Sequence, residues 1–262
     1  MPLSADEKIS LRHLREYLGG FDRYIIGEQE LPKELSDFAL RRFPAEYFTD
    51  RYGYNRLLLS AEFYRAFARY EYVLVYQLDC LVFGSNLEEW CEKEWDYVGA
   101  PWLKNPDCPD EGFSAVGNGG LSLRRVDSAL RVLRSRKLAM DPRVRGEQEG
   151  KSRVIFERLS SRSVLTRSMR GAKTLLHRTG YHNNARWLAQ HFADLQDHED
   201  TFWAFEAPRF ASFRIPEPQE ALAFAFEVAP RYCLKANSGL WPWGCHAWAK
   251  HDREFWEPML LK

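Results

Sequence analysis

The sequence predicts an α/β fold in which a mostly parallel sheet is flanked by helices. One observation is the run of apolar, β-branched and aromatic residues from Tyr72 to Tyr76, which is typical of a strand buried on both faces. A second is the alternation of predicted helices and strands before this run, which favours parallel strands. Asp79 follows the run, at the kind of strand end beyond which such sheets bind ligands. It is therefore expected to be either a ligand of a hard cation or a turn-forming residue.

The elements before the run are predicted from cap residues and apolar periodicity. Ser4 and Glu7 form a capping box, which opens an amphipathic helix that ends at the glycines from Gly19 onward. The same signals predict three further elements: a strand over residues 22–26, a short helical piece over residues 32–42 and a helix over residues 61–69.

The elements after the run are predicted in the same way. The glycines from Gly117 to Gly120 surround Asn118 and require either unusual backbone angles or the close approach of another group, although a tight turn would also explain them. The remaining predicted elements are helices over 87–95, 126–133, 154–165 and 218–226, and strands over 96–99, 121–123 and 213–215.

Composition restricts the classes of protein to be considered. The chain of 262 residues suits one large domain, and its net charge of zero argues against a dedicated nucleic-acid binder. No apolar run approaches the ~20 residues that a membrane-spanning helix needs, and the first residues do not resemble a signal peptide. The 5 cysteines are scattered and never paired as Cys-x-x-Cys, which indicates reduced thiols and a cytoplasmic protein.

Residues 124–186 differ in charge from the rest of the chain. They contain 17 Lys and Arg against 5 Asp and Glu, an excess of +12 in a chain whose charges sum to zero. We interpret this segment as a basic helical elaboration of a single domain that spans residues 1–262. Its charge is either a solvated helical face or a surface for anionic lipid head groups or a phosphate-bearing acceptor.

Five short motifs then give the chain a family resemblance. They are Tyr76 to Asp79, Val98 to Trp102, Gly117 to Arg124, Glu199 to Trp203 and Gly244 to Trp248. With these motifs in this order, the chain resembles a poorly characterised glycosyltransferase-like family, catalogued as a domain of unknown function, whose members carry Tyr-Gln-Leu-Asp and Gly-Cys-His-Ala-Trp. The resemblance runs from about Leu3 to Pro258. It implies a GT-A-like, Rossmann-like fold and a nucleotide-sugar donor.

The resemblance also implies a set of site residues. In enzymes of the GT-A type they are an Asp-x-Asp motif, a glycine-rich loop, an acidic pair and a late metal-binding His. The corresponding residues here are Gln77 and Asp79, then Gly117, Asn118, Gly119 and Gly120, then Glu199 and Asp200, and finally His246. Gln77 departs from the pattern because it carries no charge, which weakens any metal site.

A second departure concerns the start of the chain. Related chains begin with an extra apolar strand before the helix that starts here near Ser4. We therefore expect either that the start codon has been set too far downstream or that the protein lacks a central strand. A missing inner strand would leave backbone groups unpaired.

The chemistry implied is transfer of a sugar with inversion. A divalent cation, Mn²⁺ or Mg²⁺, would neutralise the leaving diphosphate, held by Asp79 and His246. Asp200 would take the proton of the acceptor hydroxyl, and Glu199 would hydrogen-bond the acceptor. The alternatives are a hydrogen-bonded core histidine for His246 and a helix start for the two acids. Arg56 could meet the diphosphate.

The predicted function is therefore a metal-assisted glycosyltransferase that moves a sugar from a nucleotide-sugar donor to an unknown acceptor, for which a glycan or a lipid-linked molecule is a candidate. One alternative is a non-catalytic relative that binds a nucleotide sugar or a glycan, which Gln77 and the absent first strand favour. Another is a nucleotidyltransferase, which would explain the acid at Asp79 but not the late His246 or the acidic pair. The products of donor breakdown distinguish the three.

Overall fold

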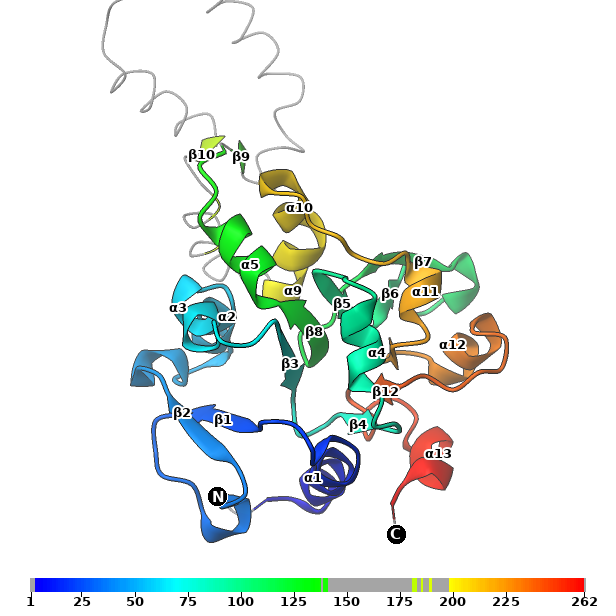
Figure 1. Ribbon diagram of the computed structural model, residues 1–262. Helices are drawn as coiled ribbons and strands as arrows, with labels where there is room; N and C mark the ends of the chain where they lie inside the picture. Colours follow the sequence, from blue (N-terminus) through cyan, green and yellow to red (C-terminus); the bar gives the residue numbers. More distant parts are fainter. Residues whose placement is uncertain are drawn as a thin grey trace, which may run out of the picture.

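The structure is a computed structural model that describes residues 3–137, 139–140, 181–182, 185, 189 and 198–261. Figure 1 shows these residues as coloured ribbons. Most of the basic segment 124–186, with the helix predicted over 154–165, lies outside the described residues.

The central sheet is antiparallel, which contradicts the predicted fold class. Its strands lie in the order β3 (Tyr72–Tyr76), β8 (Leu121–Arg125) and β5 (Tyr97–Gly99), and both neighbours run antiparallel to β8 (Figure 1). Among the described residues the other sheets have two or three strands, and only the pair of β1 (Tyr24–Gly27) and β2 (Ala39–Arg42) is wholly parallel. The expected GT-A-like, mostly parallel sheet flanked by helices is therefore wrong.

The prediction failed because a different strand from the expected one occupies the middle of the sheet. The apolar run of β3 was expected to be central, yet β3 lies at an edge and only Val75 of it is fully buried. The middle strand is β8, where Leu121, Leu123 and the polar Arg124 are all buried. Because a polar partner for Arg124 cannot be read from its neighbours in sequence, the pattern of β8 did not indicate a central strand.

Besides the β1–β2 pair, the described residues form three further small sheets. A mixed sheet has the order β11 (Ala225–Phe226), β12 (Gly244–Cys245) and β4 (Leu81–Val82), with β11 parallel and β4 antiparallel to β12. The hairpin of β6 (Pro101–Leu103) and β7 (Phe113–Val116) leads into the glycine loop. A further pair, β9 (Ala139–Met140) and β10 (Tyr181–His182), is antiparallel.

The helices are shorter than predicted, except at two places. The capping box of Ser4 and Glu7 is confirmed, with both of its hydrogen bonds present at the start of α1 (Ala5–Leu18). The helix predicted over residues 126–133 is confirmed as α5 (Val126–Leu133). The other helices within the described ranges are α2 (Arg51–Leu58), α3 (Ala61–Ala66), α4 (Leu87–Glu92), α9 (Glu199–Thr201), α10 (Ala207–Phe210), α11 (Pro218–Ala221), α12 (Pro230–Ala236) and α13 (Arg253–Trp256).

Two predicted helices and one strand are wrong. Residues 32–42 form a short 3-10 turn at Lys33–Leu35 and then strand β2, so Pro32 begins a turn and not a helix. Residues 218–226 contain the short α11 followed by strand β11. Residues 213–215 form no strand, although Phe213 packs against the core.

The core of the described residues forms three groups of buried side chains, and two of them include residues of the central sheet. One lies between α2, α3, α5 and the helical segment that begins at Glu199. A second lies around β5 and β8 and includes Trp90 of α4, and the third includes Trp248 and Trp256 near the end of the chain. No helix among the described residues has the length and apolar character needed to cross a membrane.

Candidate functional site

The mixed sheet brings three site residues to one of its ends. β11 and β12 are parallel, and Phe226 is the register partner of Cys245. The next residues along these two strands are Glu227 and His246, which therefore emerge side by side. Strand β4 runs antiparallel to β12, so the turn before it, which carries Asp79, lies at the same end. A backbone hydrogen bond from Trp248 N–H to the Asp79 carbonyl fixes this turn at 3.2 Å.

His246 lies between two carboxylates. Its Nδ1 is 2.9 Å from Oε1 of Glu227, and its Nε2 is 3.4 Å from Oδ1 of Asp79. The second contact is an ion pair without hydrogen-bond geometry, so Nε2 has no hydrogen-bond partner in the described part of the chain. Burial lowers the pKa of His246, but the neighbouring carboxylates of Asp79 and Glu227 outweigh it and raise the pKa to about 9.

Asp79 is the accessible member of this group. Its side chain is 51% exposed, against 16% for His246. Partial burial raises the pKa of the Asp79 carboxyl, but its interaction with His246 more than offsets this and lowers the pKa overall. Asp79 therefore carries a negative charge that faces solvent on one side and the imidazole on the other. The expected proximity of Asp79 and His246 is confirmed.

These residues fit a divalent cation. Two ligands that each lie ~2.1 Å from one cation are themselves about 3–3.5 Å apart, which matches the Asp79–His246 separation. The thiol of Cys80 lies in the same cluster, but burial and the charge of Asp79 raise its pKa well above the usual range. It stays a neutral thiol and donates to the Gly120 carbonyl at 3.2 Å. The remaining donor set of carboxylate and imidazole suits Mn²⁺, and the cation would have to displace the proton of His246.

The glycine loop connects this group to the acidic pair. A Cβ on Gly120 would lie 2.2 Å from Nε2 of His246, and a Cβ on Gly119 would lie 2.2 Å from Oε1 of Glu199. Neither position has room for a side chain, so the loop needs glycine for close approach. The Gly120 carbonyl also accepts a hydrogen bond of 2.9 Å from Gln77 N–H. Four predicted motifs therefore meet at one loop.

Asn118 holds this loop in its shape. Its φ of 72° lies in the left-handed region, which Asn tolerates better than most residues. Its side-chain oxygen accepts hydrogen bonds from the N–H groups of Gly120 and Leu121, which caps the start of β8. Its Nδ2 is buried and has no partner among the described residues, so a donor remains for a ligand.

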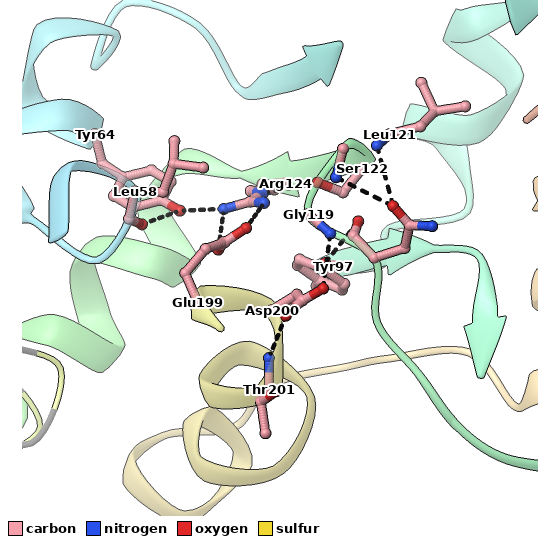
Figure 2. A network of polar contacts seen from close by, with 12 residues as sticks. Leu58, Tyr64, Tyr97, Gly119, Leu121, Ser122, Arg124, Glu199, Asp200 and Thr201 are labelled. Carbon is pink, nitrogen blue, oxygen red and sulfur yellow. Dashed lines mark hydrogen bonds and ion pairs between the residues drawn. The ribbon is translucent and has the colours of Figure 1, made fainter. Parts of the chain in front are cut away.

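Glu199 forms a buried ion pair with Arg124. The two contacts of the bidentate pair are 2.7 and 2.8 Å long, and the side chains are 3% and 1% exposed. Tyr64 accepts a third hydrogen bond from Arg124 at 3.3 Å and donates to the Leu58 carbonyl (Figure 2). Burial alone would lower the pKa of Arg124, but the Glu199 carboxylate raises it well above its usual value.

Asp200 points to the glycine loop. Figure 2 shows its carboxylate between Gly119 and Thr201, accepting from their N–H groups at 3.0 and 2.9 Å. Each carboxylate oxygen has a second lone pair, so Asp200 can still accept from a substrate hydroxyl. The adjacent acids thus have different surroundings: Asp200 is half-buried beside the loop, and Glu199 is fully buried.

The two remaining site residues predicted from the sequence are Gln77 and Arg56. Gln77 follows β3 and is half-buried, and it interacts with the Tyr54 hydroxyl, whose pKa burial raises to about 12. Arg56 is half-buried in α2, a helix that contacts α9.

Sequence reasoning missed Glu227 and Arg124. The alternation within 121–125 marks Arg124 as a residue of a strand, and its place beside a glycine loop was the available signal. Glu227 had no local signal, because it meets His246 only through the pairing of β11 with β12.

The sequence profile that matches the chain covers residues 37–246 and is described as Protein of unknown function (DUF5672). The chain matches no curated protein and no solved structure.

Proposed function

Because the chain belongs to this family of unknown function, its site must carry the functional argument, and we propose that it is a glycosyltransferase that uses a nucleotide-sugar donor. The supporting observation is the glycine loop, where Gly120 lies against His246 and Gly119 lies against the acidic pair. A group that can hold a cation and a carboxylate that can take a proton thus lie beside one short loop. A metal-assisted sugar transfer uses both kinds of group.

Asp79 and His246 are the residues that would hold Mn²⁺ or Mg²⁺, with Glu227 fixing the imidazole. The cation would supply charge to neutralise the leaving diphosphate. Glu227 accepts from Nδ1–H, which leaves Nε2 facing Asp79. Carboxylates that fix a ligating imidazole in this way are common in metal sites. The uncharged Gln77 adds no charge to the site.

Asp200 is the proposed base. The acceptor hydroxyl oxygen attacks the anomeric carbon, the bond from that carbon to the diphosphate oxygen breaks, and the hydroxyl proton passes to Asp200. The products are the glycosylated acceptor and the nucleoside diphosphate. An attack from the face opposite the leaving group inverts the anomeric carbon. Gly119 N–H orients the carboxylate throughout.

Glu199 receives a different role from the one its sequence suggested. Its two carboxylate oxygens are engaged by Arg124, and its side chain is 3% exposed, so it is poorly placed to bind an acceptor. We propose that Glu199 holds the glycine loop in place, because its Oε1 occupies the space that a Cβ on Gly119 would need.

The proposed place of action is the cytoplasm. The five cysteines at positions 80, 91, 108, 233 and 245 are all free, as expected for a reducing compartment. A nucleotide sugar is the proposed donor, and a glycan or lipid-linked molecule the proposed acceptor. Contact with an anionic membrane is proposed for the basic segment 124–186 on the strength of its charge alone.

The test is incubation with UDP-glucose, UDP-galactose, UDP-N-acetylglucosamine and GDP-mannose in the presence of Mn²⁺. Release of nucleoside diphosphate is the expected result. Asp200→Asn should lower turnover by ~10²-fold or more while nucleotide binding persists. Asp79→Asn should instead weaken Mn²⁺-dependent nucleotide binding. Asp127→Asn, at an exposed acid of α5, is the matched control and should leave both unchanged.

Two results would contradict the proposal. Release of pyrophosphate would indicate a nucleotidyltransferase. Nucleotide binding without turnover, unaltered by Asp200→Asn, would indicate a non-catalytic binding protein.

A further inference from the structure

An aromatic pair borders the glycine loop at the end away from His246. Trp102 of β6 packs so closely on Gly117 that a Cβ there would lie 2.0 Å from its ring atom Cζ2. The ring of Phe205 stacks on Trp102, with centroids 6.0 Å apart and planes inclined by 28°. Phe205 is 49% exposed, and Trp102 is half-buried. The pair therefore presents an aromatic surface to solvent beside the loop.

The backbone around Phe205 is unusual. Phe205 lies in the π-helical turn η5 (Phe202–Glu206), which continues directly from α9, where Asp200 is located. Its neighbours Phe202, Trp203 and Glu206 in this turn are buried. A π-helical turn inserted in a helix is frequent at functional sites. Phe205 is thus a large apolar residue left accessible a few residues after the proposed base.

The glycine loop sets the order of these groups. Gly117 contacts Trp102, Gly119 donates to Asp200, and Gly120 lies against His246. Four consecutive residues span about 10 Å at most, so all three contacts fall within the length of one sugar unit or two. Along the loop, the contact with Asp200 therefore falls between the contact with Trp102 and the contact with His246. Between them the loop also carries Asn118, with its buried and unpartnered Nδ2.

We propose that Trp102 and Phe205 form the acceptor subsite and stack against a pyranose ring of a glycan. One face of a pyranose ring carries C–H groups that can lie on an aromatic surface, while its hydroxyls remain at the edge. With the ring on this pair, an edge hydroxyl lies on the side of Asp200. The subsite rests on the proposed glycosyl transfer and names its acceptor class.

The test follows the indole N–H signal of Trp102 by NMR in the ¹⁵N-labelled full-length chain. The signal is assigned as the one lost in Trp102→Phe. Methyl glycosides of glucose, galactose, mannose and N-acetylglucosamine are titrated separately, and at least one should shift it. Phe205→Ala and Phe205→Leu should both weaken that Kd about tenfold, because both remove the ring. Phe48→Ala removes another exposed ring (37%) and should leave the Kd unchanged.

Several outcomes would overturn the subsite. They are a Trp102 signal that no glycoside shifts, a signal that uridine or guanosine shifts in place of the glycosides, and equal binding by Phe205→Ala and the unaltered chain. The proposed function is tested separately, by nucleotide release from the donors on the same sample. A glycoside bound at Trp102 without any donor turnover would support the subsite while refuting the transferase. Turnover with an acceptor KM that Phe205→Ala does not change would refute the subsite alone.

Discussion

Removing Glu199 should strongly destabilise the fold, because it would leave Arg124 charged and buried without a partner. The pair has two contacts of 2.7 and 2.8 Å, and the Arg124 side chain is 1% exposed. Only the hydroxyls of Ser122 and Tyr64 would remain as hydrogen-bond partners of its guanidinium among the described residues. Breaking a buried pair in this way costs about 3–5 kcal/mol. For a chain of this size that corresponds to a fall in Tm of about 6–20 °C.

The assay is thermal unfolding of Glu199→Ala followed by circular dichroism. The control is Asp6→Asn, which breaks the exposed pair of Arg253 with Asp6, where both contacts are 2.9 Å long. Exposed pairs contribute about 0–1 kcal/mol, so the control should shift Tm little. The double variant Arg124→Met with Glu199→Leu should recover part of the loss, because it removes both charges. Equal shifts in Glu199→Ala and the control would refute the reasoning.

Three other predictions use the loop, a buried histidine and the basic segment. Gly120→Ala should weaken Mn²⁺ binding at least ~10-fold, because the new Cβ would displace His246. The control Gly20→Ala, where a Cβ meets nothing within 4 Å, should bind Mn²⁺ like the unaltered chain. Equal Mn²⁺ affinities of the two variants in a titration would contradict this prediction. Burial lowers the pKa of His13, whose Nδ1 bonds the Val82 carbonyl, so the folded state binds fewer protons than the unfolded state below pH ~6.5. The free energy of unfolding should therefore fall as the pH drops from 7 to 5, and it should fall less steeply in His13→Gln. Identical pH dependences of the unfolding free energy in His13→Gln and the unaltered chain would contradict this prediction. The charge excess of +12 in residues 124–186 should make the protein sediment with anionic vesicles at low salt and not at high salt. If the protein does not sediment with anionic vesicles even at low salt, the basic segment is a solvated surface and does not bind membranes.

The sequence predicted the helices and strands that depend only on interactions between residues close together in the chain. The capping box at Ser4 needs only residues within one turn, and β3 (Tyr72–Tyr76) needs only its own apolar run. Strand pairing is different, because it depends on residues far apart in the chain. The register of β8 with β3 joins positions about fifty residues apart, and nothing in either segment indicates that they run antiparallel. The fold class was wrong for this reason.

The residues of the candidate site show the same difference between local and distant interactions. Asp79, His246 and the glycine loop stood out because each belongs to a short motif of unusual residues. Glu227 and Arg124 act through a partner that only the folded chain supplies, so each looked like an ordinary charged residue. Residues whose role is to fix another side chain are therefore the ones that sequence reasoning misses.

Arg124 also explains how a loop that contains adjacent glycines can keep one conformation at this site. A segment with two glycines next to each other loses more conformational freedom on folding than other sequences do. Here β8 is held on both sides by antiparallel neighbours, and the Arg124–Glu199 pair joins it to the helical segment that carries Asp200. Gly119 and Gly120 are thereby fixed between two rigid elements, with Asp200 bonded to one glycine and His246 packed on the other. The buried ion pair lies outside the proposed chemistry, yet it sets the distance between the groups that would perform it.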